Sequence, residues 1–158
     1  MNKKLKYVVK ILKEKKKTIS TMESCTGGGI ANQITNIKGA SSVFQFSAVT
    51  YSNEYKVKLG VSSKTIEKYS VYSMQTAREM AKSISDFSKS NLGIGVTGKL
   101  GVPDYNNNEG KDNEVFICIY DRDLDKYNDI SLFVNSEDRK DDKLEIIEVL
   151  VDFLYKYV

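Results

Sequence analysis

The chain has 158 residues, 41% of them hydrophobic, which fits one globular domain over residues 1–158. Its formal net charge of +3 is too small to indicate nucleic acid as a partner. No apolar run is long enough to cross a membrane and no segment resembles a signal peptide, so we expect a cytoplasmic protein without a membrane partner. The absence of histidine excludes Ser-His-Asp triads, Cys-His dyads and histidine zinc sites, and the two cysteines cannot supply a four-sulfur zinc site, so we expect no metal and no cofactor.

The first third of the chain alternates between helical and extended patterns. Leu5, Val8 and Leu12 recur at helical spacing among many lysines, which predicts an amphipathic helix over residues 3–16. A short β-branched strand, Thr18–Met22, leads through a glycine-rich turn into a second helix. That helix extends from Ile30 to Ile37, and Val43–Tyr51 has the β-branched and aromatic composition of another strand.

The middle of the chain is mostly helical by its pattern. Residues Ser52–Leu59 and Ser62–Tyr69 predict two short helical segments, and Ser73 is a suitable N-cap for a longer helix. One face of that longer helix carries the apolar residues Met74, Ala77, Ala81 and Ile84, with Met80 and Phe87 beside them.

The last part of the chain predicts three strands and a helix. The strand Leu92–Thr97 ends in a second glycine turn, Gly98–Gly101, and the Asn-rich segment Pro103–Asp112 is expected to be a mobile loop. Glu114–Tyr120 and Asp129–Val134 pair as antiparallel strands across Asp121–Asn128. A final helix from about Asp138 turns Leu144, Ile147, Val151 and Leu154 inward. This order of elements predicts an α/β fold, a layered sandwich of helices around a mixed, mostly parallel sheet with a late antiparallel hairpin.

Three predicted strand ends carry polar residues or glycines. The first, with Glu23, Ser24, Thr26, Gly27 and Gly28, is a strand-to-helix turn whose backbone N–H groups can hold a phosphate or an oxyanion, or simply join the two elements. The second carries Tyr51, Asn53 and Lys56, and the third Thr97 and Gly98. Ligands bind outside the carboxyl ends of strands in α/β sheets, so we expect the three to converge on one pocket.

These segments, together with Leu59-Gly60-Val61, Ala77–Ala81 and Asp138-Arg139, resemble in order the C-terminal domain family of competence/damage-inducible protein A. The resemblance implies an amidohydrolase that converts nicotinamide mononucleotide to nicotinic acid mononucleotide and ammonia, without a cofactor. It assigns the nucleophile to Ser24, the general base to Lys56 and a helping phenol to Tyr51. It also implies a small-molecule nucleotide as substrate and a homo-oligomer.

The remaining candidate residues each have two interpretations. Glu23 orients Lys56 or caps the following helix, and Arg139 binds a phosphate or sits in the first turn of the last helix. Cys25 is a packing residue or, at a helix N-terminus, a reactive thiol. The substrate-binding set is completed by Thr26, Gly27, Gly28, Asn53, Thr97 and Gly98.

The segment after Gly98 departs from the family pattern. The family follows Val-Thr-Gly with an apolar residue and then Ala-Gly-Pro and more glycines, whereas this chain has Lys99, Leu100 and an Asn-rich stretch to Asn108, with Asn113 where a glycine is usual. This favours, as an alternative, a weak or inactive relative that still binds a nucleotide. A dinucleotide-binding fold is disfavoured because Gly27, Gly28 and Gly29 are contiguous. The lysine-rich start is interpreted as a solvated helix face rather than a nucleic-acid site.

Overall fold

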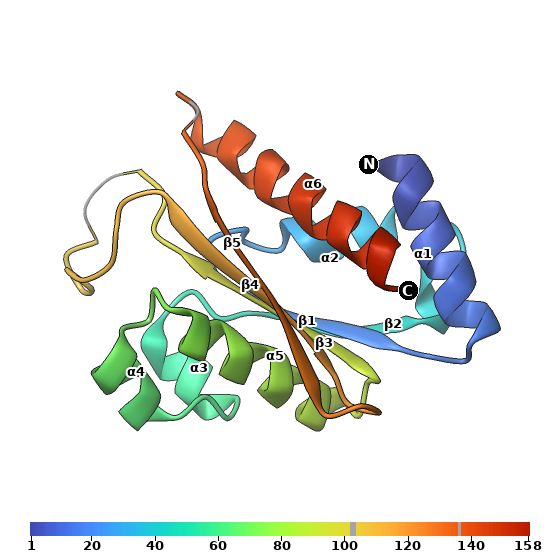
Figure 1. Ribbon diagram of the computed structural model, residues 1–158, viewed down its shortest axis with the longest axis horizontal. Helices are drawn as coiled ribbons and strands as arrows, with labels where there is room; N and C mark the ends of the chain where they lie inside the picture. The colour runs from blue at the N-terminus through green and yellow to red at the C-terminus, as the bar shows by residue number, and fades with distance from the viewer. Residues whose placement is uncertain (102–103, 136) are drawn as a thin grey trace.

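The computed structural model describes residues 1–101, 104–135 and 137–158. These residues form a five-stranded sheet in the order β2-β1-β3-β4-β5, with helices on both faces (Figure 1). The predicted α/β sandwich is therefore confirmed. None of the helices in the described ranges has the length and apolarity that crossing a membrane requires.

The sheet has a parallel part and an antiparallel end. β1 (Ile19–Glu23) pairs in parallel with β2 (Phe44–Val49) on one side and with β3 (Leu92–Gly98) on the other. β4 (Glu114–Asp121) and β5 (Lys126–Phe133) then add as antiparallel neighbours. Glu23, the last residue of β1, is in register with Val49 and with Val96, so the segments that follow the three parallel strands leave from one edge.

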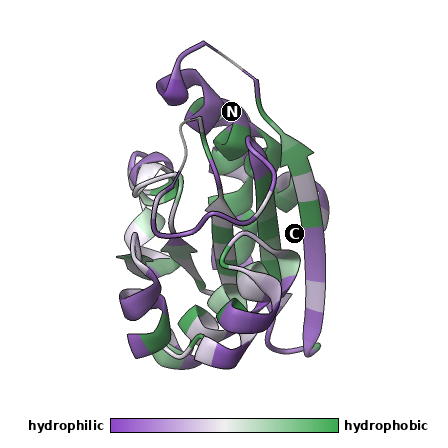
Figure 2. Ribbon diagram, turned by 90° about the vertical axis from the view of Figure 1, so that its left-hand side faces the viewer, coloured by the Kyte–Doolittle hydropathy of each residue, from purple (hydrophilic) through white to green (hydrophobic). Residues whose placement is uncertain are grey.

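The helices are divided between the two faces of the sheet. α1 (Asn2–Glu14), α2 (Gly29–Thr35) and α6 (Arg139–Tyr157) lie on one face, and α3 (Asn53–Lys58), α4 (Ser63–Tyr69) and α5 (Met74–Ser88) lie on the other (Figure 1). A 3-10 turn, η1 (Ala40–Ser42), precedes β2. The larger part of the core lies under α1, α2 and α6, and two smaller clusters lie under α5. In Figure 2 the inner strands are mostly green and the outer helices carry much of the purple, as expected for amphipathic helices on a buried sheet.

Glycines in β3 let α5 approach the sheet closely. A Cβ atom on Gly93 would lie 2.0 Å from the carbonyl oxygen of Ala81, and one on Gly95 would lie 2.2 Å from that of Ala77. Any larger residue at either position would push the helix away from the sheet. Gly95 therefore serves packing, and the glycine turn that the sequence suggested begins only after β3 ends at Gly98.

Several predicted boundaries and orientations are wrong. The hairpin turn is shorter than Asp121–Asn128, because the Asp121 carboxylate accepts hydrogen bonds from the N–H groups of Asp123 and Leu124, and β5 starts already at Lys126. Phe87 is 59% exposed rather than part of the buried face of α5. Leu144 is also exposed, because it lies at the margin of the stripe that α6 buries, which is formed by Asp142, Ile146, Ile147, Leu150, Val151 and Leu154.

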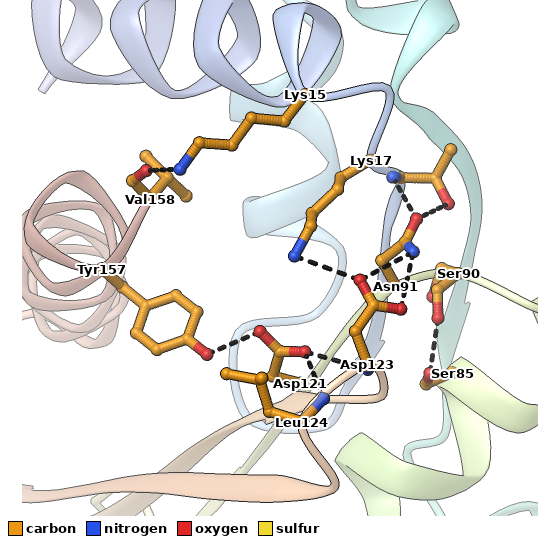
Figure 3. Close-up of polar contacts among 11 residues, drawn as sticks. Lys15, Lys17, Ser85, Ser90, Asn91, Asp121, Asp123, Leu124, Tyr157 and Val158 are labelled. Carbon is orange, nitrogen blue, oxygen red and sulfur yellow. Dashed lines mark hydrogen bonds and ion pairs between the residues drawn. The ribbon is translucent and has the colours of Figure 1, made fainter.

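A polar network ties the last helix and the first loop to the amino ends of the parallel strands (Figure 3). The Tyr157 hydroxyl donates to Asp121 over 2.7 Å, and the ammonium of Lys17 lies 3.1 Å from Asp123. Asn91, just before β3, also donates to Asp123 over 3.0 Å. This end of the sheet is held by internal contacts, and the candidate site lies at the opposite, carboxyl edge.

Candidate active site

Ser24 lies immediately beyond the end of β1, at the wall of a cavity. Its N–H donates to the carbonyl of Val96 over 3.1 Å, which continues the pairing between β1 and β3 by one residue. Its carbonyl accepts from the N–H of Gly27, so the chain turns sharply toward α2. Gly27 and Gly28 both have positive φ, 62° and 90°, a conformation that favours glycine. The side chain of Ser24 is thereby held at a fixed point of the carboxyl edge.

The fully buried carboxylate of Glu23 caps this turn. One oxygen accepts from the Thr26 hydroxyl at 2.7 Å and from the N–H groups of Gly28 and Ile30 at 3.0 and 3.1 Å, and the other accepts from the N–H of Ala31 at 2.9 Å. The capping interpretation of Glu23 is the one that the geometry matches. The donors that the sequence offered to a phosphate or an oxyanion at Gly28 and the start of α2 are therefore already engaged by the protein itself.

Lys56 reaches Ser24 from α3. Its side chain is 1% exposed, its Nζ lies 3.1 Å from the Ser24 Oγ, and it donates to the carbonyl of Thr50 over 2.6 Å. Burial lowers the pKa of Lys56 from 10.5 to about 8, against the opposing effects of Cys25 and Asp104. Near pH 8 a large fraction of this amine is neutral, and a neutral amine can accept the hydroxyl proton of Ser24.

The thiol of Cys25 is less suited to nucleophilic chemistry. It is 2% exposed, and burial raises its pKa to about 12. The thiolate is the reactive form of cysteine, so this thiol is almost entirely unreactive at neutral pH. The packing interpretation of Cys25 is therefore favoured over the reactive one.

Ser24 opens onto a cavity of about 450 Å³ at the carboxyl edge of the sheet. That volume is within the range that small-molecule ligands occupy. The described residues that line it are Ser24, Cys25, Tyr51, Ser52, Asn53, Tyr72, Gly98, Lys99, Leu100, Asp104, Asn106, Asn107 and Arg139. Side chains from three predicted strand ends thus meet at one cavity, with Lys56 buried behind Ser24.

Tyr51 and Arg139 form one side of this cavity. The guanidinium of Arg139, at the start of α6, donates to the Tyr51 hydroxyl over 3.0 Å and also to the carbonyl of Leu100. The Tyr51 phenol is 65% exposed, and its recorded hydrogen bond is to Arg139 rather than to Lys56. An exposed guanidinium therefore stands at the cavity wall, far in sequence from the glycine turn after β1, for which the sequence left a phosphate, an oxyanion or a merely connecting role open.

The other predicted site residues divide between the cavity and the protein interior. Asn53 lines the cavity and donates to the Asn107 side chain over 2.8 Å. Gly98 also lines it, although it pairs with Val115 as part of β3. Thr97 is fully buried and donates to the carbonyl of Val71 over 2.9 Å, so its hydroxyl serves the interior. Thr26, Gly27, Gly28 and Glu23 are absent from the described lining.

Sequence reasoning missed several residues of this cavity. Tyr72, Asp104 and Asn107 line it, and Asp104 accepts hydrogen bonds from the other two; none was named as a site residue, although Asp104 and Asn107 fall in the altered segment after Gly98. Val102 and Pro103, part of the segment expected to be unusual, lie outside the described residues. No group of three or more Cys, Asp or Glu side chains in the described ranges is placed to hold a metal ion.

The fold and the cavity define an α/β domain with a buried lysine hydrogen-bonded to a serine at the carboxyl edge of its sheet. The sequence model of the CinA C-terminal domain matches residues 1–158, so the chain belongs to this family. The predicted family resemblance is confirmed.

Relatives and solved structures agree with this assignment. The chain is 55% identical over 95 residues to a competence-damage inducible protein of Alkaliphilus oremlandii and 47% identical over 111 residues to a CinA-like protein of Flavobacterium psychrophilum. The matches cover 60% and 70% of this chain but 23% and 26% of those relatives, so the chain spans about a quarter of their length.

Two crystal structures are similar over almost the whole chain. The competence or damage-inducible protein of Enterobacter asburiae has a TM-score of 0.90 at 23% identity, covering 99% of this chain and 96% of its own. The competence/damage inducible protein CihA of Agrobacterium tumefaciens has a TM-score of 0.87 at 26% identity, covering 97% and 92%. These similarities establish the fold.

Proposed function

We propose that this chain is an amidohydrolase that converts nicotinamide mononucleotide to nicotinic acid mononucleotide and ammonia, with Ser24 as nucleophile and Lys56 as general base. The observation that carries the proposal is the 3.1 Å contact between the Lys56 Nζ and the Ser24 Oγ at the wall of a ligand-sized cavity. A chain without histidine needs another base for a serine nucleophile, and a buried lysine with a lowered pKa meets that need.

In the first half of the proposed reaction, neutral Lys56 accepts the proton of the Ser24 hydroxyl while the Oγ bonds to the carboxamide carbon. The carbonyl oxygen becomes an oxyanion. The N–H groups of Cys25 and Thr26, which follow the nucleophile, donate to no other residue among those the structure describes and are our candidates for holding it. The Lys56 ammonium then gives its proton to the amide nitrogen, the C–N bond breaks, and ammonia leaves.

In the second half, water attacks the ester carbon of the acyl-enzyme while Lys56 again accepts a proton. The tetrahedral adduct collapses with cleavage of the bond to Ser24, whose oxygen regains the proton from Lys56, and the carboxylic acid product is released. The Lys56 Nζ donates to the carbonyl of Thr50 over 2.6 Å, and in our proposal this contact holds the amine in place. That carbonyl takes up one of the two N–H groups of a neutral amine, and we propose that the lone pair faces the Ser24 hydroxyl.

The accessible guanidinium of Arg139 is our candidate for the phosphate of the nucleotide, because arginine pairs with phosphate through two parallel hydrogen bonds. We further propose that residues 1–158 act as one catalytic domain in the cytoplasm. Two free, buried cysteines are typical of proteins from a reducing compartment.

The test is an assay of ammonia release from nicotinamide mononucleotide with the wild-type protein, Ser24→Ala and Cys25→Ala. We expect wild-type activity, loss of at least about 10³-fold in Ser24→Ala, and near wild-type activity in Cys25→Ala. Absence of release by the wild-type protein, with the nucleotide still bound, would support instead the weak or inactive nucleotide-binding relative that the altered segment after Gly98 favours.

A further inference from the structure

The segment after β3 carries the one carboxylate among the described residues of the cavity wall, that of Asp104. Its hydrogen-bond partners within the described ranges are all neutral. One oxygen accepts from the Tyr72 hydroxyl and from the Asn107 amide at 2.8 Å, and the other accepts from the N–H of Asn106 at 2.9 Å. None of the ion pairs found among the described residues involves Asp104. The wall therefore holds a negative charge that forms no ion pair with another described residue, although it acts on Lys56 at longer range.

Contacts with two other elements hold this carboxylate in position. Tyr72 belongs to the segment just before α5, and Asn107 accepts at 2.8 Å from Asn53, the first residue of α3. Both partners line the cavity. Asp104 is thus fixed to the helical layer on the α3 and α5 side of the sheet, so its charge is placed before any ligand arrives.

The base of the same segment is also closed by specific contacts. The Lys99 ammonium, at the end of β3, lies 2.9 Å from the Asp112 carboxylate. Asn113 has a φ of 63°, donates its N–H to the Lys99 carbonyl over 2.7 Å, and accepts from the N–H of Gly101 at 2.9 Å through its side chain. Asparagine tolerates this left-handed conformation better than most residues, which accounts for its presence where the family usually has glycine.

The charges of the cavity have a defined arrangement. The Arg139 guanidinium, at the start of α6, contacts Tyr51, whereas the Asp104 carboxylate contacts Tyr72, just before α5. The Asp104 carboxylate already accepts three hydrogen bonds, so about one of its acceptor positions remains for a cation that brings several N–H donors. A cation without N–H groups needs no acceptor position, because the charge of Asp104 and the ring of Tyr72 can stabilise it. Such a cation therefore suits the surroundings of Asp104 better.

We propose that Asp104 is a specificity-determining residue that binds the cationic, fully substituted ring nitrogen of a pyridinium carboxamide while Arg139 binds the anionic end of the same molecule. This inference rests on the proposed amidohydrolase function and goes beyond it by assigning the recognition of the ring charge to one side chain. A ligand with a positive ring and a negative phosphate is complementary in charge to both Asp104 and Arg139. A neutral ring would bring no counter-charge to the carboxylate of Asp104.

The test compares two ligands of the same shape that differ in ring charge. The first is nicotinamide mononucleotide, and the second is benzamide ribonucleotide, in which a neutral benzene ring replaces the pyridinium. Their dissociation constants are measured by calorimetry in the Ser24→Ala background, so that turnover does not interfere, with and without Asp104→Asn. The control is Glu109→Gln, which removes the same charge from an exposed position of the same segment outside the cavity.

We expect Asp104→Asn to weaken the binding of nicotinamide mononucleotide roughly tenfold and that of benzamide ribonucleotide less than twofold, and Glu109→Gln to change neither by more than twofold. An equal loss for both ligands would reduce Asp104 to a structural role and overturn the inference, as would an unchanged affinity for the cationic ligand. Failure of the Ser24→Ala protein to bind either nucleotide would instead overturn the proposed function itself. Thermal unfolding of each variant identifies any that has lost its fold.

Discussion

Replacing Lys56 by methionine should lower the activity, and it should remove a pH-dependent contribution that lowers the free energy of unfolding. Methionine has similar length and no charge, so it removes the buried amine with little change in packing. The wild-type amine has a pKa of about 8 in the folded protein and an ordinary value of 10.5. Between these values the unfolded chain binds a proton that the folded protein does not, so the free energy of unfolding rises with pH through this window.

The size of the effect follows from the shift. A change from 10.5 to about 8 corresponds to about 3 kcal/mol, fully present as a penalty well below pH 8 and removed above pH 10.5. Between pH 7.0 and 9.5 the wild-type protein should therefore gain about 2 kcal/mol relative to Lys56→Met. Lys56→Met also lacks the hydrogen bond that Lys56 donates to the Thr50 carbonyl. This loss lowers the stability of the variant by roughly 1–2 kcal/mol, equally at both pH values.

Urea denaturation of the wild-type protein and Lys56→Met at pH 7.0 and 9.5 measures the difference in their free energies of unfolding. Other groups titrate in the same way in both proteins, so their contributions cancel. Lys58→Met is the matched control, because Lys58 lies on the same helix with its side chain 57% exposed and pairs with Glu54 at 2.6 Å. An exposed ion pair of this kind stabilises a protein by at most about 1 kcal/mol. The difference in the free energy of unfolding between the wild-type protein and Lys58→Met should therefore change by less than about 0.5 kcal/mol between the two pH values. A pH-independent difference for Lys56→Met would refute a lowered pKa at Lys56.

The remaining predictions concern activity and ligand binding. The value of kcat/KM should rise about tenfold per pH unit below pH 8 and level off above it, since the base must be neutral; a profile that is flat from pH 6 to 9 would exclude Lys56 from that role. Activity should persist in excess chelator, and loss that a divalent ion restores would contradict a serine–lysine mechanism. Arg139→Ala should weaken binding of nicotinamide mononucleotide by more than tenfold but leave nicotinamide riboside, which lacks the phosphate, within about twofold. The neighbouring Lys140→Ala serves as its control, and equal losses for both ligands would show that the guanidinium does not bind the phosphate.

Part of the candidate site follows from local sequence. Ser24 follows a short, β-branched strand closely, and Lys56 comes a few residues after another strand. Parallel neighbours in register bring the segments after their carboxyl ends together, so the two residues were expected at one pocket from the order of elements alone. The cap by Glu23 is also a local feature, because the carboxylate and the N–H groups that it accepts from lie within eight residues.

Other features depend on packing between distant segments. Arg139 meets Tyr51 across 88 residues, and Tyr72 meets Asp104 across 32. Neither contact is indicated by periodicity or by turn residues in the sequence. Each depends on how a helix is placed on the sheet and on how far a loop extends over the cavity. The inward prediction for Leu144 failed for a related reason, since the rotation of α6 on the sheet decides which residues of a broad apolar stripe are buried.

The sequence by itself determined the α/β class, the order of most elements and the chemistry available, because hydrophobic periodicity and residue types act locally. It also restricted the base for a serine nucleophile to residues other than histidine. Only the tertiary structure decided that Lys56 is buried against Ser24, that Glu23 occupies donors of the glycine turn, and that Asp104 and Arg139 line one cavity. These are consequences of burial and of distances between chain segments, which are set when the helices pack on the two faces of the sheet.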